Sequence, residues 1–441
     1  MTSIAAAPAN ARPAATSRLD QVLDRIAAGG RDKVSAFTRL YPEVARAAAL
    51  ASDRRRAEGS GLGPLDGRIL SVKDLFDIAG ETTAAGSAVL RDQPPAATDA
   101  PAIARLKQAG AVIVGKTVMT EFAFSAVGLN PHDGNVDNPR APGRIAGGSS
   151  TGAVVSVVDG TSDIAIGSDT GGSLRIPAAL SGAVGFKPTA GRVPTSGAFS
   201  LSSTLDVVGS IAGNVADCAL ADAVLAGESA YVQAPVAAAE VRLVVPRGRL
   251  FADMEAVVAE AFEAALGRLR AAGMTIEEGG LEAELDRLAA IDALGAFTAI
   301  ELAATLRELG VGSLDRVDPK TRARIEAGAG RAAPDYVRMV RLRDRLVSDI
   351  AARMADGTVF VLPTVPVTAV PIAEVLDDAV FHRVNGLVLR NPRVANLFDC
   401  PAISLPMATG GLPAGLMLMG RRGSDRDLLA IAGAAEAALA R

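Results

Sequence analysis

Residues 147–188 read GGSSTGAVVSVVDGTSDIAIGSDTGGSLRIPAALSGAVGFKP, and the interpretation of the chain starts from them. Two Gly-Gly-Ser sequences lie in this stretch, at Gly147–Ser149 and Gly171–Ser173. Glycine beside serine lets backbone amides approach a ligand closely, because no side chain is in the way. Successive amides in a tight turn also bind anions. The stretch therefore predicts a serine nucleophile with an oxyanion hole, and a second serine held near it.

The second Gly-Gly-Ser sequence is placed between a strand and a helix. Residues 164–167 are a short apolar run that predicts a strand, and residues 174–180 predict the start of a helix. Ser173 is then expected at a helix N-terminus, where backbone amides and the helix dipole favour negative charge. An N-capping serine would occupy the same place, so both roles stay open for Ser173.

Two familiar patterns occur near this stretch, and their context argues against both. Gly110–Thr117 (GAVIVGKT) fits the phosphate-loop pattern, but its intervening residues are those of a strand. We therefore expect Lys116 at a strand end, in a structural hydrogen bond. Gly148–Gly152 fits the nucleophile-elbow pattern centred on Ser150. That elbow requires a strand before it, whereas a proline-rich loop precedes this one.

A lysine is the best candidate for a catalytic base. Lys73 is one of six lysines and directly follows residues 68–72 (RILSV), which predict a buried strand. Burial lowers the pKa of a lysine, so that its neutral amine can accept a proton. A serine nucleophile with a lysine base is a known variant of the catalytic triad. An ion pair with Asp74 or Asp77 is the alternative role for Lys73.

Composition limits the remaining classes of function. The chain has 441 residues, 49% of them hydrophobic and 21% charged, with a net charge of −4 and no tryptophan. This composition predicts a globular protein without a nucleic-acid footprint. Cys218 and Cys400 are the only cysteines, and His132 and His382 the only histidines. We expect a reducing compartment, no disulfide and no multi-histidine metal site. Without an evident secretory signal or membrane-spanning run, we expect a cytoplasmic protein.

The order of predicted elements indicates an α/β architecture. Strands and helices alternate from residue 68 to residue 187. Residues 1–16 are expected to form a disordered tail, followed by a helix capped by Ser17. Residues 130–146 are dense in Asn, Pro and Gly and predict a loop. Long helices over 281–309 and 333–354 are expected to be peripheral, and His382 is expected on a solvated loop.

Taken together, these residues resemble the amidase signature family. The resemblance rests on Lys73 within SVKDLFDIAG, on the GGSSxG sequence from Gly147 and on the DTGGSLRxPA sequence from Asp169. Further matches are GKTVMTEFAF before the stretch, GFKPT after it, LPT at 362–364, NxxDCPA at 396–402 and GLPxG at 411–415. The resemblance covers most of the chain, from about residue 17 onward.

The resemblance implies both a fold and a catalytic site. The fold is a single α/β domain over residues 17–441, in which a central, twisted, mixed β-sheet is covered by helices on both faces. Residues 68–210 form its catalytic core, and residues 281–355 form peripheral helices. In the implied Ser–cis-Ser–Lys triad, Ser173 is the nucleophile, Ser149 relays the proton and neutral Lys73 is the base. A cis peptide bond joins Gly148 to Ser149, and the oxyanion hole consists of the amides of Thr170, Gly171, Gly172 and Ser173.

The resemblance also places the substrate pocket near residues 119–130. Its implied walls are Met119, Phe122, Phe124, Ser125, Gly128 and Thr151, with Glu121 and Asn130 nearby. Phe122 and Phe124 are equally consistent with ordinary core residues. The segment offers no cation for a charged substrate apart from Arg175, which the family has generally.

The implied activity is that of an amidase. It would hydrolyse a small carboxamide, at a non-peptide C–N bond, to a carboxylate and ammonia or an amine through a Ser173 acyl-enzyme, with no metal or organic cofactor. The alternatives are the glutaminase-type component of a tRNA-dependent amidotransferase, a urea-amide hydrolase of the biuret or allophanate type, and a non-catalytic scaffold. We expect a small-molecule amide as partner, no nucleic acid and no membrane, and a homodimer by analogy with the family.

Overall fold

A large mixed β-sheet organises the molecule, a computed structural model that describes residues 13–29, 35–228 and 235–440. Within these residues, eleven strands form one sheet in the order β1-β3-β2-β6-β8-β7-β12-β13-β11-β9-β10. The strands are β1 Phe37–Leu40, β2 Ile69–Lys73, β3 Val112–Thr117, β6 Ile164–Ser168, β7 Val184–Lys187, β8 Val208–Ala212, β9 Arg242–Pro246, β10 Thr275–Gly279, β11 Val359–Pro363, β12 Ala402–Met407 and β13 Ala414–Met419.

The sheet is parallel near both ends and antiparallel in the middle. Strands β3, β2 and β6 run parallel, as do β11, β9 and β10, whereas β6, β8, β7, β12, β13 and β11 pair antiparallel in that order. Every residue of β2, β3 and β6 is buried, as expected for strands covered on both faces. The carboxyl ends of these three parallel strands lie at one edge, where α/β folds commonly place ligand sites.

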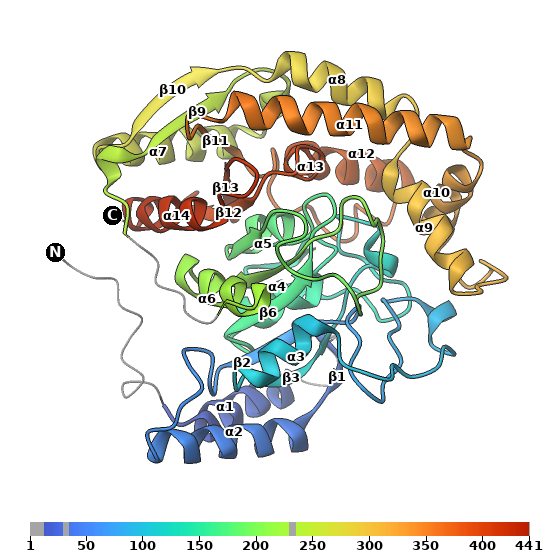
Figure 1. Cartoon of the computed structure of the whole chain (residues 1–441), viewed down its shortest axis with the longest axis vertical. Coiled ribbons are helices and arrows are strands. Elements are labelled where there is room, and N and C mark those ends of the chain that lie inside the picture. Colours follow the sequence, from blue (N-terminus) through green and yellow to red (C-terminus); the bar gives the residue numbers. More distant parts are fainter. Residues whose placement is uncertain (1–12, 30–34, 229–234, 441) are drawn as a thin grey trace.

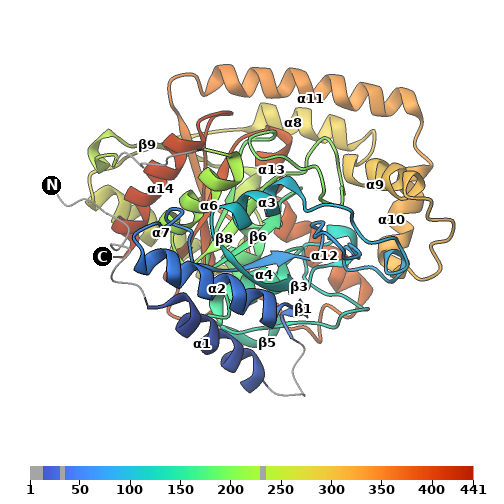
Figure 2. The same ribbon diagram turned by 60° about the horizontal axis from the view of Figure 1, so that its bottom comes forward.

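Helices cover both faces of the sheet (Figures 1 and 2). Successive strand residues point to opposite faces, so Ile69 packs into one hydrophobic cluster and Leu70 into another. The first cluster includes residues of α1 Ala15–Ala28, α2 Pro42–Ala57, α4 Thr151–Val158 and α5 Arg175–Ser181. The second includes residues of α3 Pro101–Gln108, α6 Val215–Ala226, α7 Ala256–Ala271 and α14 Asp425–Leu439. The predicted single α/β domain with a mixed sheet is confirmed.

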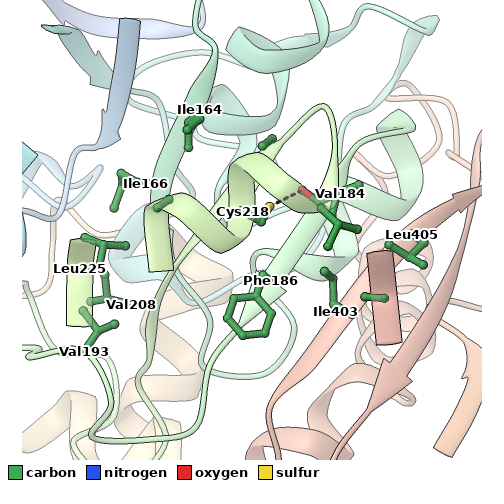
Figure 3. Packing of buried hydrophobic residues seen from close by; sticks show 14 of the residues in the cluster. Ile164, Ile166, Val184, Phe186, Val193, Val208, Cys218, Leu225, Ile403 and Leu405 are labelled. Atoms are coloured by element: carbon green, nitrogen blue, oxygen red, sulfur yellow. Dashed lines mark hydrogen bonds between the residues drawn. The ribbon is translucent and has the colours of Figure 1, made fainter. Parts of the chain in front are cut away.

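Figure 3 shows part of the second cluster. Ile164, Ile166 and Phe186 lie around α6, and the dashed line marks the contact from Cys218 Sγ to the Val184 carbonyl, at 3.7 Å. Both cysteines are free and buried, and burial raises the pKa of the Cys218 thiol. Cys218 therefore behaves as a small hydrophobic residue of the core.

Four helices of the second half lie on the outside of the molecule: α8 and α11 at the end opposite α1 and α2, and α9 and α10 along one side (Figure 1). They are α8 Glu282–Asp292, α9 Phe297–Glu308, α10 Pro319–Ala329 and α11 Ala333–Arg353. The sequence predicts one helix over 281–309, but the structure divides it at Gly295, where φ is 152°. The last two helices before β12 are α12 Asp378–Leu389 and α13 Pro392–Leu397.

The segment 282–308 is long and apolar enough to cross a membrane by length and composition, with a mean hydropathy of 1.5. The expectation that no apolar run reaches membrane-spanning length is therefore wrong by length and composition. The structure divides this segment between two helices, and it buries Phe297, Leu302 and Leu306 in the protein interior. Packing in the protein interior therefore accounts for part of its apolar character, since 39% of its most apolar stretch is buried.

Three local expectations differ from the structure. Helix α1 begins at Ala15 rather than after Ser17, because the Asp53 carboxylate accepts the Ala15 amide at 2.7 Å and the Thr16 amide at 3.1 Å. The rest of the expected tail, residues 1–12, lies outside the described residues. Residues 130–146 contain a two-stranded sheet, β4 Asp137–Asn138 and β5 Ala141–Ile145. His382 is exposed, but it lies on α12 and not on a loop.

Candidate active site

Lys73 and Ser168 meet because they end neighbouring parallel strands. Strand β2 ends at Lys73 and β6 at Ser168, and the register pairs Val72 with Ile166. Lys73 Nζ donates to Ser149 Oγ at 2.7 Å and to Ser168 Oγ at 3.0 Å, and its side chain is fully buried. Ser168 was not singled out from the sequence, although its place directly before the Asp169 turn was a usable signal.

The surroundings of Lys73 suit a proton acceptor. Burial lowers its pKa to about 7, against the opposing effect of the Asp169 and Asp206 carboxylates. The neutral, proton-accepting form of Lys73 is therefore accessible near neutral pH. The alternative role in an ion pair is wrong, because Asp74 pairs with Lys116 Nζ at 3.4 Å and Asp77 accepts from Thr83 Oγ1 at 2.6 Å. Lys116 itself lies within β3 and makes this ion pair; its ammonium makes no hydrogen bond within the described residues.

The peptide bond between Gly148 and Ser149 is cis, as the resemblance implied. The segment is held by the Gly148 amide, which donates to the Ala126 carbonyl at 2.8 Å, and by the Ser149 carbonyl, which accepts from the Thr120 amide at 3.2 Å. A Cβ at position 148 would lie 2.9 Å from Thr120 Cγ2, so this close packing requires glycine. Ser150 points elsewhere: its hydroxyl donates to the Ser168 carbonyl at 3.4 Å, and it precedes α4.

The turn from Thr170 to Ser173 presents backbone amides next to the Ser173 side chain. Within the described residues, the amides of Thr170, Gly171 and Ser173 make no hydrogen bond, and neither does Ser173 Oγ. The Gly172 amide donates to Asp169 Oδ1 at 2.8 Å. The implied oxyanion hole is therefore reduced by one donor, because the Gly172 amide already has an acceptor.

A buried ion pair fixes this turn. Asp169 accepts from Arg175 Nη2 at 2.8 Å and from Nε at 3.0 Å, and both side chains are fully buried. Asn396 Nδ2 also donates to Asp169 Oδ1 at 2.9 Å. Burial raises the pKa of Asp169, but the Arg175 guanidinium outweighs it and holds that pKa at about 2. Arg175 is thus occupied by the turn, which agrees with the supporting role expected for it.

Asp206 is a second carboxyl group behind the turn, and the sequence reading missed it. Its side chain accepts from Thr170 Oγ1 at 2.6 Å and from Ser200 Oγ at 3.0 Å. Burial raises the pKa of Asp206 to about 6. Asp206 thus has two effects: it holds Thr170 of the turn by a hydrogen bond, and its negative charge raises the pKa of Lys73. Its only sequence signal was a single acidic residue in an otherwise uncharged loop.

A cavity opens in front of Ser173. It has a volume of about 110 Å³, room for several water molecules. Two of the implied pocket residues, Phe124 and Ser125, line it. The other walls come from the 201–205 segment, the α8–α9 turn, α10 and the α12–α13 region, and include Leu201, Leu205, Asp292, Phe297, Arg324, Leu389, Arg393 and Leu397. The helices predicted as peripheral therefore supply part of the cavity wall.

The other implied pocket residues do not line the cavity. Phe122 is fully buried and stacks on Phe199, with ring centroids 5.5 Å apart, so its role is that of a core residue. The Met119 carbonyl accepts from Asn130 Nδ2 at 2.7 Å. Thr151 Oγ1 donates to the Gly128 carbonyl at 3.4 Å. These contacts shape the loop that carries Phe124 and Ser125.

Two arginines that the sequence reading missed line the cavity, Arg324 from α10 and Arg393 from α13. Arg393 donates to both carboxylate oxygens of Asp292, at 3.0 and 2.5 Å. Arg324 donates to the Phe124 carbonyl and stacks over the Phe124 ring, 3.6 Å from its centroid. Among the described residues, no group of three or more His, Cys, Asp and Glu side chains could hold a metal ion.

Comparison with known proteins identifies the family to which the chain belongs. The family model described as amidase matches residues 19–429. The chain belongs to the amidase signature family. It is a hydrolase that acts on the carbon–nitrogen bonds of amides.

Individual amidase relatives match the chain over almost its full length. The 2-amino-5-chloromuconic acid deaminase of Comamonas testosteroni is 36% identical over 88% of this chain and 85% of its own length. One component of the glutamyl-tRNA(Gln) amidotransferase of Roseiflexus sp. (strain RS-1) is 34% identical over 93% of this chain and 90% of its own. A crystal structure described as an amidase superimposes with a TM-score of 0.87 at 32% identity, over 98% of this chain and 97% of the other.

Proposed function

We propose that this amidase hydrolyses a small carboxamide, at a non-peptide C–N bond, through an acyl-enzyme on Ser173. One observation carries the proposal: a fully buried lysine lies 2.7 Å from Ser149 Oγ, behind a cavity that Ser173 lines. A lysine with a lowered pKa and an adjacent serine supply the base and the relay that a serine nucleophile needs.

In the proposed mechanism, Lys73 Nζ accepts the proton of Ser149 as Ser149 accepts the proton of Ser173. Ser173 Oγ then forms a bond to the amide carbonyl carbon. The amides of Thr170, Gly171 and Ser173 are the free donors available to the oxyanion, and one such donor stabilises a transition state by about 3 kcal/mol. The relay returns a proton to the leaving nitrogen as the C–N bond breaks. Water then cleaves the Ser173 ester and releases the carboxylate.

The size of the cavity favours a small substrate. A volume of about 110 Å³ in front of Ser173 suits a small amide better than a folded peptide. One relative is described as a deaminase of 2-amino-5-chloromuconic acid, and another as a component of a glutamyl-tRNA(Gln) amidotransferase. A further relative, from Pseudomonas sp. (strain ADP) and 32% identical, is described as a subunit of 1-carboxybiuret hydrolase, so a urea-type amide and glutamine stay as alternative substrates. Cytoplasmic location and a homodimer stay predictions.

Ammonia release from a series of amides tests the proposed activity. We expect the isolated chain to release ammonia from at least one aliphatic, aromatic or urea-type amide. We also expect added hydroxylamine to yield the hydroxamate of the same acyl group, because it intercepts the Ser173 ester. Activity only in the presence of partner proteins would instead favour the amidotransferase alternative. Turnover without any trappable acyl group would contradict the acyl-enzyme.

The pH dependence tests the role of Lys73. Its pKa of about 7 means that the neutral, basic form is lost as the pH falls. We expect kcat/KM to fall about tenfold per pH unit below pH 7 and to level off above pH 8. Asp206 raises the pKa of Lys73, so Asp206→Asn should move this limb to lower pH. A kcat/KM that is flat from pH 5.5 to pH 8, or that rises toward acid, would contradict a neutral-lysine base.

A further inference from the structure

The cavity in front of Ser173 carries one positive charge that no described residue neutralises. Three charged side chains line it, namely Asp292, Arg324 and Arg393. Asp292 and Arg393 form a bidentate pair, so their charges cancel. Among the described residues, no carboxylate forms an ion pair with Arg324. A cation without a counterion in a partly desolvated wall is costly unless an anion joins it.

The Arg324 guanidinium is fixed by contacts with Phe124 that leave some of its N–H groups available to a ligand. It lies over the Phe124 ring, 3.6 Å from the centroid, and its Nη1 donates to the Phe124 carbonyl. A guanidinium has five N–H donors, and stacking on an aromatic face leaves its edge open. Within the described residues, Nε and Nη2 of Arg324 make no hydrogen bond. Burial lowers the pKa of Arg324 to about 10, so the side chain keeps its charge at neutral pH.

Helix α10 is fixed at its start by the segment that lines the cavity. The Asp318 amide donates to Glu121 Oε2 at 2.9 Å, and Asp318 caps the helix by accepting the amides of Lys320 and Thr321. Glu121 Oε1 in turn accepts from Ser87 Oγ at 2.7 Å. A buried carboxylate thus connects α10 to the loop of Phe124. These contacts fix α10, and therefore Arg324, relative to the cavity.

We propose that Arg324 binds a carboxylate of the substrate, so that the protein acts on amides that carry a free carboxylate besides the amide group that is cleaved. This inference rests on the proposed function, because it assigns the substrate class of the same site. The planar edge of a guanidinium matches a carboxylate through two parallel hydrogen bonds. The sequence pointed to Arg175 for this role, but the Arg175 guanidinium is occupied by Asp169, Asn396 and the Pro392 carbonyl.

Matched pairs of substrates test the proposal. The monoamides of the three- to five-carbon dicarboxylic acids (malonamate, succinamate and glutaramate) carry one carboxylate, and the corresponding diamides have nearly the same shape without charge. We expect the wild-type protein to favour the best monoamide over its diamide. Arg324→Gln should lower kcat/KM for that monoamide by about 10- to 100-fold, the range for a hydrogen-bonded charge, mainly through KM. The same change should leave kcat/KM for the diamide within about threefold of the wild-type value.

Arg322 provides the matched control. It lies on α10 two residues earlier, is exposed and pairs with Asp315 and Glu326 away from the cavity. We expect Arg322→Gln to leave kcat/KM for both substrates unchanged. We expect Arg324→Lys to keep part of the preference for the monoamide. An equal loss for monoamide and diamide in Arg324→Gln, or a wild-type preference for the diamides, would overturn the proposal.

Binding separates this proposal from the proposed function. Calorimetric titration of the Ser173→Ala protein with the three monoamides requires no turnover. We expect saturable binding of one of them, weakened about 10- to 100-fold by the additional change Arg324→Gln. If the wild-type protein releases no ammonia from any amide but this difference in binding persists, the proposed function fails and the role of Arg324 stands. If ammonia is released but the difference is absent, the role of Arg324 fails and the proposed function stands.

Discussion

Replacing Ser173 by alanine is expected to lower kcat for amide hydrolysis by about 10⁴- to 10⁶-fold, the cost of removing a nucleophile that acts as a unit with its base. The side chain makes no hydrogen bond within the described residues and lines the cavity. Its loss should therefore leave the thermal unfolding midpoint within about 2 °C of wild type. Ammonia release measured with high enzyme concentration, together with a melting curve, checks both parts.

Ser150→Ala is the control for this experiment. Ser150 is the centre of the alternative nucleophile-elbow pattern, yet its hydroxyl donates to the Ser168 carbonyl and does not line the cavity. We expect its removal to change kcat by less than about tenfold, as for the loss of one neutral hydrogen bond. Equal inactivation of the two variants would assign the nucleophile to neither serine. Near-normal turnover by Ser173→Ala would refute the acyl-enzyme on Ser173.

Replacing Lys73 by methionine is expected to lower kcat by about 10²- to 10⁴-fold, the usual contribution of a general base. The same change should increase stability. The unfolded chain holds the Lys73 proton up to its ordinary pKa of 10.5, whereas the folded protein releases it near pH 7. This difference penalises the folded state fully below pH 7, and the penalty disappears as the pH rises to 10.5. We expect a gain of about 1–3 kcal/mol in the free energy of unfolding at pH 7 and a smaller gain at pH 9.

Lys116 is the control for Lys73. It is also buried, on the neighbouring strand β3, but it pairs with the Asp74 carboxylate. Lys116→Met should lower stability at pH 8, because it leaves Asp74 buried without a cation, and it should keep kcat within about tenfold. Denaturant unfolding and ammonia release measure the two effects. A stabilised but fully active Lys73→Met protein would show that this lysine is not the base.

Sequence patterns predicted the parts of the site that depend on local order. Lys73 follows a buried strand, and the glycine-rich turns can be recognised from a short run of residues. Helix α2 begins at Pro42, where proline favours the first turn of a helix. The hydrogen bond from the Gly172 amide to Asp169 was not predictable, because it depends on the three-dimensional conformation of the turn.

The missed parts depend on contacts between distant segments. Arg324 lies on a helix with no pronounced apolar stripe, so its sequence resembles a solvent-exposed surface. Only the tertiary fold brings that helix against the loop of Phe124. Strand β1 was missed for a related reason: it is a four-residue edge strand with only Phe37 fully buried. The hairpin β4–β5 contains proline and glycine, which usually indicate a loop.

The contacts of Asn396 have a consequence for the order in which the chain is synthesised. Asn396 and the Pro392 carbonyl complete the surroundings of Arg175 and Asp169, more than two hundred residues after the turn itself. A nascent polypeptide that has left the ribosome as far as residue 380 contains Lys73, Ser149, Ser173 and the Asp169–Arg175 pair, but it lacks Pro392 and Asn396, which complete the contacts of that pair. Catalytic competence is therefore gained late in translation, when the molecule is nearly complete. An amino-terminal fragment should therefore lack amidase activity until a separately supplied carboxyl-terminal fragment restores these contacts.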